Sequence, residues 1–118
     1  MFNKTLVAIA GLCIFTITAC SDENMHKFTL WIDMNHIGLK ADFYGKEGSD
    51  ECYNLPYYIN DKATSINTRG GCVALYQHAN CHGRKVIFKM DCSSDRCCPH
   101  NNFAACKFND QASSYEMC

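Results

Sequence analysis

Two stretches of this sequence recur in the same order, and this repeat constrains the fold more than any other feature. The first stretch covers residues 30–40 and again 75–85, with a leucine, an aromatic residue, an asparagine, a glycine and a lysine at matching offsets. The second covers residues 60–65 and again 109–114. Because two separate blocks recur in one order, we expect two structural units of roughly 45 residues each. These units would span residues 27–69 and 70–118.

Each unit has the local pattern of β-structure. Residues 28–32 and 72–76 are short runs rich in apolar and aromatic side chains, and residues 39–44 and 85–90 resume strand-like alternation. Between the two runs of each unit stands a glycine that can take a positive φ in a tight turn. Residues 69–71, Arg-Gly-Gly, would connect the units. No window of a dozen residues shows helical periodicity with caps, so the pattern predicts a small antiparallel all-β sandwich.

The beginning of the chain is predicted to be a signal peptide that covers residues 1–20. Lys4 supplies the positive charge, and residues 6–17 form an apolar run of signal-peptide length that is short for a membrane span. The mature domain would then cover residues 21–118. The sequence Ile-Thr-Ala-Cys at positions 17–20 resembles a bacterial lipobox, in which Cys20 would be acylated. Cleavage by an ordinary signal peptidase near the same point is the alternative.

The cysteines are expected to form disulfides. The chain of 118 residues contains 10 Cys, of which Cys13 leaves with the leader and Cys20 lies at its processing site. The remaining eight can pair completely, and thiols of an exported chain oxidise. Their spacing is not that of a zinc site, and the sequence does not choose among the possible pairings. The eight are Cys52, Cys72, Cys81, Cys92, Cys97, Cys98, Cys106 and Cys118.

Several function classes are disfavoured by composition and motif content. The length indicates a single domain, and a formal net charge of −1 lacks the basic footprint of a nucleic-acid binder. No nucleophile elbow, His-Glu-x-x-His motif or phosphate-binding loop is present in the sequence. We therefore expect a non-enzymatic protein without an organic cofactor, which acts by binding or as a structural component.

The second repeated stretch offers oxygen ligands that suit calcium. In residues 60–65 and 109–114, the pattern Asn-Asp-x-x-Ser/Thr-Ser presents an amide oxygen, a carboxylate and a hydroxyl on a turning backbone. Calcium binds such mixed oxygen ligands, and one carboxylate per loop predicts a modest dissociation constant of roughly 10⁻⁶–10⁻³ M. The alternative interpretation is purely structural, because Asn, Asp and Ser also form turns through bonds to the backbone.

The two repeated blocks together resemble the βγ-crystallin Greek-key motif over residues 27–117. An aromatic residue followed by a glycine, and then Asn-Asp-x-x-Ser/Thr-Ser, occurs once in each unit. The resemblance implies a disulfide-stapled sandwich of two Greek keys. His36 and Cys81 stand where the family usually has Phe or Tyr, so we expect weaker aromatic packing there, offset by a disulfide at Cys81. The Cys-rich insert 92–100 is similar to exported relatives, namely syncollin-like secretory proteins and crystallin-type peptidase inhibitors.

The resemblance also implies two calcium sites, each with a carbonyl from the hairpin of the other unit. The first would use Asp61, the carbonyl of Lys62, Thr64 and the carbonyl of Gln77. The second would use Asp110, the carbonyl of Gln111, Ser113 and the carbonyl of Ile32. Asn60 and Asn109 would hold the loops or contribute directly, whereas Ser65 and Ser114 would bond to the folded hairpins.

The leading functional hypothesis is a secreted calcium-binding protein with an unknown protein or surface partner. The first alternative is a secreted peptidase inhibitor or toxin-like effector, in which residues 92–106 form the target-binding loop. The second alternative is a lipid-anchored envelope protein, in which Cys20 carries the lipid and provides the only membrane contact. One side chain of the Tyr57-Tyr58 pair is expected to face outward, where it could contact a partner.

Overall fold

The computed structural model describes residues 25–92 and 96–118. The predicted signal peptide and the candidate lipidation site Cys20 lie outside the described residues, as do residues 93–95 of the Cys-rich insert. Within the described residues, no helix is both long enough and apolar enough to cross a membrane.

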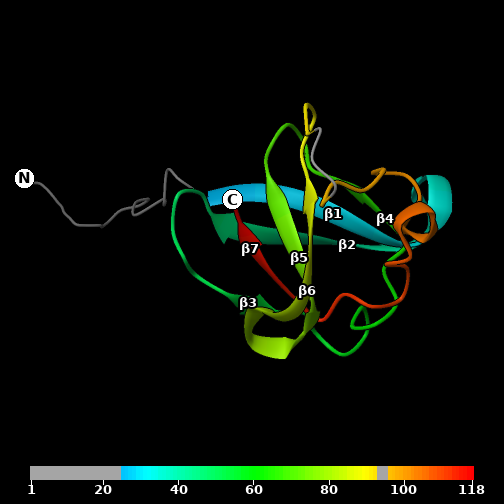
Figure 1. Cartoon of the computed structure of the whole chain (residues 1–118). Helices are drawn as coiled ribbons and strands as arrows, with labels where there is room; N and C mark the ends of the chain where they lie inside the picture. The colour runs from blue at the N-terminus through cyan, green and yellow to red at the C-terminus, as the bar shows by residue number, and fades with distance from the viewer. Residues whose placement is uncertain (1–24, 93–95) are drawn as a thin grey trace, which may run out of the picture.

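The strands form two antiparallel sheets, and β1 and β2 run across β5 and β6 (Figure 1). The first sheet has the order β2-β1-β4 and consists of β1 (Met25–Asp33), β2 (Ile37–Lys46) and β4 (Ser65–Asn67). The second has the order β3-β7-β5-β6 and consists of β3 (Tyr53–Asn54), β5 (Val73–His78), β6 (His82–Phe88) and β7 (Ser114–Met117). Helical structure in the described residues is limited to the short 3-10 segments η1 (Met34–His36), η2 (Ala79–Cys81) and η3 (Phe103–Cys106). The all-β prediction is confirmed.

The two units exchange their third segments. Strand β3 belongs to the first unit but pairs with β7 in the sheet of the second unit. In return, the His100 carbonyl of the second unit accepts a hydrogen bond from Ile66 N–H of β4 at 2.8 Å, and Phe103 N–H donates to Thr64 O at 2.8 Å. Each unit therefore contributes backbone hydrogen bonds to the sheet of the other unit, so neither sheet is built from one unit alone.

The tight hairpins expected at the first repeated stretch are present in both units. Asn35 and Asn80 have φ values of 61° and 62°, and Gly38 and Gly83 have φ values of 88° and 83°. A Cβ at Gly38 would lie 2.4 Å from Asp33 Oδ2. Because L-residues rarely adopt this region and the space is also filled, Gly38 is required by both backbone and packing.

His36 and Cys81, the two departures from the family pattern, are compensated in different ways. The His36 ring lies 4.6 Å from the Trp31 ring, centroid to centroid, and its Nε2 bonds to the Ile66 carbonyl at 2.8 Å. Cys81 forms a disulfide with Cys52, as expected for a staple at this hairpin. The first hairpin thus keeps a ring contact, whereas the second is held covalently.

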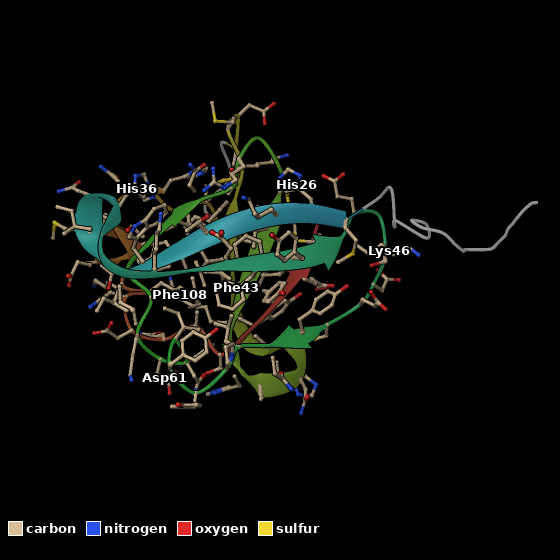
Figure 2. All side chains as sticks on the ribbon, turned by 180° about the vertical axis from the view of Figure 1, so that it is seen from behind. His26, His36, Phe43, Lys46, Asp61 and Phe108 are labelled. Carbon is tan, nitrogen blue, oxygen red and sulfur yellow. A yellow bond between two sulfur atoms is a disulfide. The ribbon has the colours of Figure 1, made fainter. Side chains whose placement is uncertain are left out.

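The core lies between the sheets and is rich in aromatic side chains. Phe28 of β1 meets Tyr115 of β7 edge to face, with ring centroids 4.9 Å apart. The labelled Phe43 and Phe108 in Figure 2 are both buried. The Cys-rich part of the second unit contributes Phe103, whose ring lies 4.7 Å from Phe88. Burying aromatic rings in such contacts supplies much of the stabilisation of a small β-sandwich.

The eight cysteines that the sequence assigned to disulfides are all paired. The neighbours Cys97 and Cys98 belong to two different bridges. The four bridges join Cys52 to Cys81, Cys72 to Cys118, Cys92 to Cys97, and Cys98 to Cys106.

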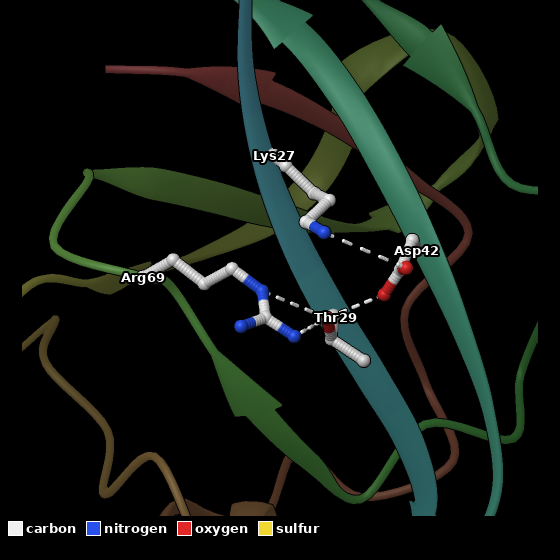
Figure 3. A network of polar contacts seen from close by, with 4 residues as sticks. All are labelled: Lys27, Thr29, Asp42 and Arg69. Carbon is white, nitrogen blue, oxygen red and sulfur yellow. Dashed lines mark hydrogen bonds and ion pairs between the residues drawn. The ribbon is translucent and has the colours of Figure 1, made fainter.

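A polar network ties β1 to β2 and to the turn between the units (Figure 3). The fully buried Thr29 donates from its hydroxyl to Asp42 Oδ1 at 2.6 Å. The Thr29 hydroxyl oxygen accepts hydrogen bonds from Arg69 Nε at 3.2 Å and from Arg69 Nη2 at 2.9 Å. The Thr29 bond, together with the charges of Lys27, Arg69 and Lys40, lowers the pKa of the Asp42 carboxyl despite partial desolvation.

Candidate calcium site

The two Asn-Asp loops lie side by side and hold each other through reciprocal backbone bonds. Asp61 N–H donates to Ala112 O, and Asp110 N–H donates to Ala63 O, both at 2.9 Å. Both aspartates have φ of 58°, and both alanines are fully buried. The Asn-Asp dipeptides of the sequence therefore form two equivalent loops, each anchored by a small buried residue of the other unit.

The side chains of the two loops cross in the same way. Ser113 Oγ donates to Asp61 Oδ1 at 3.0 Å, and Thr64 Oγ1 donates to Asp110 Oδ1 in a longer contact of 3.4 Å. The resemblance implied one site with Asp61 and Thr64 and a second site with Asp110 and Ser113. In the structure, each carboxylate contacts the hydroxyl of the opposite loop, because the loops run past each other.

The folded hairpins supply the backbone carbonyls next to these hydroxyls. Thr64 N–H donates to Trp31 O and Ser113 N–H donates to Tyr76 O, both at 2.8 Å. The next residues along the two strands are Ile32 and Gln77, whose carbonyls the resemblance implied as ligands. Ile32 therefore lies near Thr64, and Gln77 lies near Ser113.

A surface depression opens beside Asp61, which is labelled in Figure 2. Its lining contains two carboxylates, one hydroxyl, two amide side chains and one imidazole. These residues are Asp61, Gln77, His78, Asp110, Gln111 and Ser113. His78 was missed by sequence reasoning, although its place directly after Gln77 at the end of β5 is a usable signal. Asp33 occupies the corresponding position of the first unit.

The remaining candidate residues, Asn60, Lys62, Asn109 and Gln111, belong to the same two loops. Lys62 N–H donates to Ile59 O at 3.0 Å, and Asn60 N–H donates to Pro56 O at 2.9 Å. Gln111 Nε2 donates to Lys107 O at 3.2 Å, and Asn109 is exposed. These bonds shape the loops and leave the carbonyls of Lys62 and Gln111 as candidate ligands.

The two serines that end the repeated loops bond to the hairpins, as expected. Ser65 Oγ donates to Asp33 O at 2.6 Å and accepts from His36 N–H at 3.2 Å. Ser114 Oγ donates to His78 O at 2.6 Å and accepts from Cys81 N–H at 2.8 Å. Both serines are buried, and each hydroxyl binds a hairpin carbonyl one residue beyond the candidate ligand carbonyl of Ile32 or Gln77.

The donor atoms at these loops suit a hard cation. In the ranges 25–92 and 96–118, no group of three or more His, Cys, Asp or Glu side chains is arranged to hold a metal ion. The available donors are carboxylate, hydroxyl and carbonyl oxygens, with one aspartate from each loop. This donor set fits calcium, which accepts mixed oxygen ligands in flexible geometry, better than it fits zinc.

The Cys-rich stretch expected as an alternative target-binding loop contributes substantially to the fold. Cys98 and Phe103 are buried, and the backbones of His100 and Phe103 bond to β4 and to the residue that precedes it. Ile87 N–H donates to the Arg96 carbonyl at 3.0 Å. These interactions hold residues 96–106 against the sandwich.

Solved structures with this fold come from distant organisms. No family model matches the chain, and no curated protein matches it in sequence. A βγ-crystallin from Ciona intestinalis is 17% identical with a TM-score of 0.58, over 78% of this chain and 99% of that one. A βγ-crystallin domain from Clostridium beijerinckii is 22% identical with a TM-score of 0.56, over 76% and 94%.

A third similar structure is a βγ-crystallin domain of Abundant Perithecial Protein from Neurospora crassa, described in its Ca²⁺-bound form. It is 17% identical with a TM-score of 0.55, over 84% of this chain and 93% of that one. Together with the exchanged segments and the paired hairpins, these likenesses show that the chain has the βγ-crystallin fold.

Proposed function

We propose that this chain is a secreted, non-enzymatic protein that binds two calcium ions between its repeated loops. The observation that carries the proposal is the pair of crossed contacts, Ser113 with Asp61 and Thr64 with Asp110. Each contact brings a carboxylate and a hydroxyl together at a fixed turn. A cation would replace the hydroxyl proton as the partner of the carboxylate.

Each proposed ion would join the two units. One ion would bind the Asp61 carboxylate, the Ser113 hydroxyl and the Gln77 carbonyl, and the other would bind Asp110, Thr64 and the Ile32 carbonyl. The carbonyls of Lys62 and Gln111 are further candidates on the same loops. Because an ion that binds only the folded chain stabilises it by mass action, calcium would raise the free energy of unfolding. The similar Neurospora crassa domain is described as Ca²⁺-bound.

The proposal that the protein is secreted is supported by the disulfides. Four bridges link cysteines of the described residues, and such bridges persist in oxidising compartments. The predicted signal peptide at residues 1–20 agrees with this. A modest affinity for calcium would also suit an extracellular compartment, where the ion is abundant.

Calorimetric titration of the oxidised protein with calcium tests the proposal. We expect binding heat for two sites and a higher unfolding temperature at millimolar calcium. The variant carrying both Asp61→Ala and Asp110→Ala should lose both effects. Asp50→Ala is the matched control, because Asp50 is an exposed aspartate in another loop. If the wild type gave neither heat nor a thermal shift, calcium binding would be excluded as the function.

A further inference from the structure

The two sheets differ at the outer edge formed by the second strand of each unit. In the second unit, the edge of β6 is covered, because Ile87 N–H bonds to the Arg96 carbonyl and Ile87 forms a bridge with Cys97. The equivalent strand β2 is the terminal strand of its sheet. Within the described residues, β2 pairs with β1 alone. An uncovered strand edge is a template for pairing with another strand.

Lys40 and Asp42 present their backbone groups to this open edge. The Trp31 carbonyl points towards β4, because it accepts a hydrogen bond from Thr64 N–H. The backbone N–H and C=O of successive strand residues point to opposite sides, so those of Leu30 point towards β2. Leu30 is paired with Ala41, so the backbone groups of Ala41 point towards β1. The backbone groups of the even-numbered residues of β2, including Lys40 and Asp42, therefore point away from β1. The Tyr44 carbonyl agrees with this alternation, because it accepts from the Tyr115 hydroxyl at 2.7 Å instead of from β1.

We propose that two copies of this chain associate by antiparallel pairing of their β2 strands, with the twofold axis at Ala41. In this register, Lys40 of each copy lies opposite Asp42 of the other. The backbone groups of these two residues then form hydrogen-bonded pairs across the interface. The proposal does not depend on calcium binding.

The charges select this register over its neighbours. Only registers that shift by two residues keep the outward backbone groups paired. The neighbouring registers would set Lys40 opposite Lys40, or Asp42 opposite Asp42, and like charges directly opposite each other destabilise a sheet. The central register gives two opposite-charge pairs instead. Asp42 is held in place for such a pair by the Thr29 hydroxyl.

The same register covers exposed apolar surface. Leu39 is 54% exposed and Ile37 is 59% exposed, although both are large apolar side chains. Leu39 would lie opposite Phe43 of the second copy, on the face that continues the core. Towards the end of β2, the outward backbone N–H of Lys46 already has a partner, because it donates to the Tyr53 hydroxyl at 3.2 Å. The pairing is therefore confined to the middle of β2.

Sedimentation equilibrium on the oxidised protein tests the proposal through charge reversal. The wild type should show a concentration-dependent monomer–dimer equilibrium. Lys40→Glu should raise the dimer dissociation constant by about tenfold or more, because it creates two like-charge pairs. Asp42→Lys should do the same. An equimolar mixture of the two variants should form heterodimers, since both cross-strand pairs then become attractive again.

Lys89→Glu is the matched control and should leave the dimer unchanged, because this exposed lysine lies outside β2. Thermal unfolding of each variant establishes that it is folded. Should Asp42→Lys fail to fold, Lys40→Glu is sufficient, since Lys40 is an exposed side chain of the open edge. The proposal is overturned by a wild type that stays monomeric at every soluble concentration. A dimer insensitive to Lys40→Glu, or folded variants whose mixture does not dimerise, would also overturn it.

Discussion

The hydroxyl of Ser113 donates a hydrogen bond to Asp61 Oδ1 at 3.0 Å, across 52 positions of the sequence. Its counterpart, Thr64 with Asp110, spans 46 positions in the opposite direction. Each carboxylate of the repeated loops is thus matched with a hydroxyl of the other unit. The two units share their candidate cation sites as they share their third segments.

The crossed contacts predict which substitutions affect the same site. In an Asp61→Ala background, one calcium site should remain. Adding Ser113→Ala should leave the affinity of that site unchanged, because Ser113 belongs to the site already lost. Adding Thr64→Ala should weaken it, because Thr64 contacts Asp110. Calorimetric titration measures both outcomes, and the reverse pattern would support a grouping of Asp61 with Thr64.

The Thr29 hydroxyl is expected to contribute to stability through its bonds to Arg69 and Asp42. Thr29→Val keeps the shape of this fully buried side chain but removes the hydroxyl. The free energy of unfolding should fall by about 1–3 kcal/mol, the usual cost of losing a buried hydrogen-bonding partner. Urea unfolding of the wild type and the variant at neutral pH measures the loss.

The same substitution should change the acid sensitivity of the protein. The pKa of Asp42 is lowered in the folded state, chiefly by the Thr29 hydroxyl. The associated stability is therefore present above the unfolded-state pKa and is lost as the pH falls through the lowered folded-state pKa. In Thr29→Val this acid-dependent loss should be smaller. An equal loss in both proteins, measured by urea unfolding at a series of acidic pH values, would contradict the assignment.

Alkaline pH should destabilise the fold through two tyrosines. Burial, together with the neighbouring Tyr53, raises the pKa of Tyr115 to about 12, and burial next to Glu116 raises the pKa of Tyr76 to about 12. Because the unfolded chain ionises first, near a pKa of about 10, stability is complete below that pH and falls as the pH rises towards the folded-state values.

Tyr115→Phe tests this expectation, because it removes one of the two raised groups. The decline of stability above pH 10 should be shallower in the variant than in the wild type, with the remainder due to Tyr76. The ultraviolet absorbance of tyrosinate should also lose one late-titrating group. Tyr57→Phe is the control for the stability measurement, since Tyr57 is 87% exposed and its replacement should leave the decline of stability above pH 10 unchanged.

The disulfides should stabilise the fold more when they close a longer segment of chain, with a contribution that grows as the logarithm of the loop length. Replacing Cys52 and Cys81 by serine opens a loop with a sequence separation of 29 and should cost about 2–4 kcal/mol. Replacing Cys92 and Cys97, separated by 5, should cost about 1–2 kcal/mol less. Urea unfolding without reductant compares the two double variants. Equal losses would indicate that chain entropy does not dominate.

Much of the fold follows from local sequence properties. The Leu-aromatic runs and the glycines at positions 38 and 83 predict two hairpins, because side-chain alternation and positive φ are properties of short segments. The strands β1, β2 and β5 occur where these patterns indicate them. The oxygen-rich loops at 60–65 and 109–114 were also found from residue types alone.

Other features depend on how distant segments meet. The sequence shows eight cysteines but does not indicate which of them pair. It also shows Asp61, Thr64 and Ser113 but does not indicate which hydroxyl contacts the Asp61 carboxylate. The cause is that crossing angles and strand exchange arise from packing across the core, which local pattern does not encode. Among the residues that the structure describes, the same packing leaves β2 with an open edge while the Cys-rich stretch covers β6. The sequence alone therefore determined the repeat, its hairpins and its ligand types, and only the tertiary structure decided the disulfide partners, the crossed sites and the free edge.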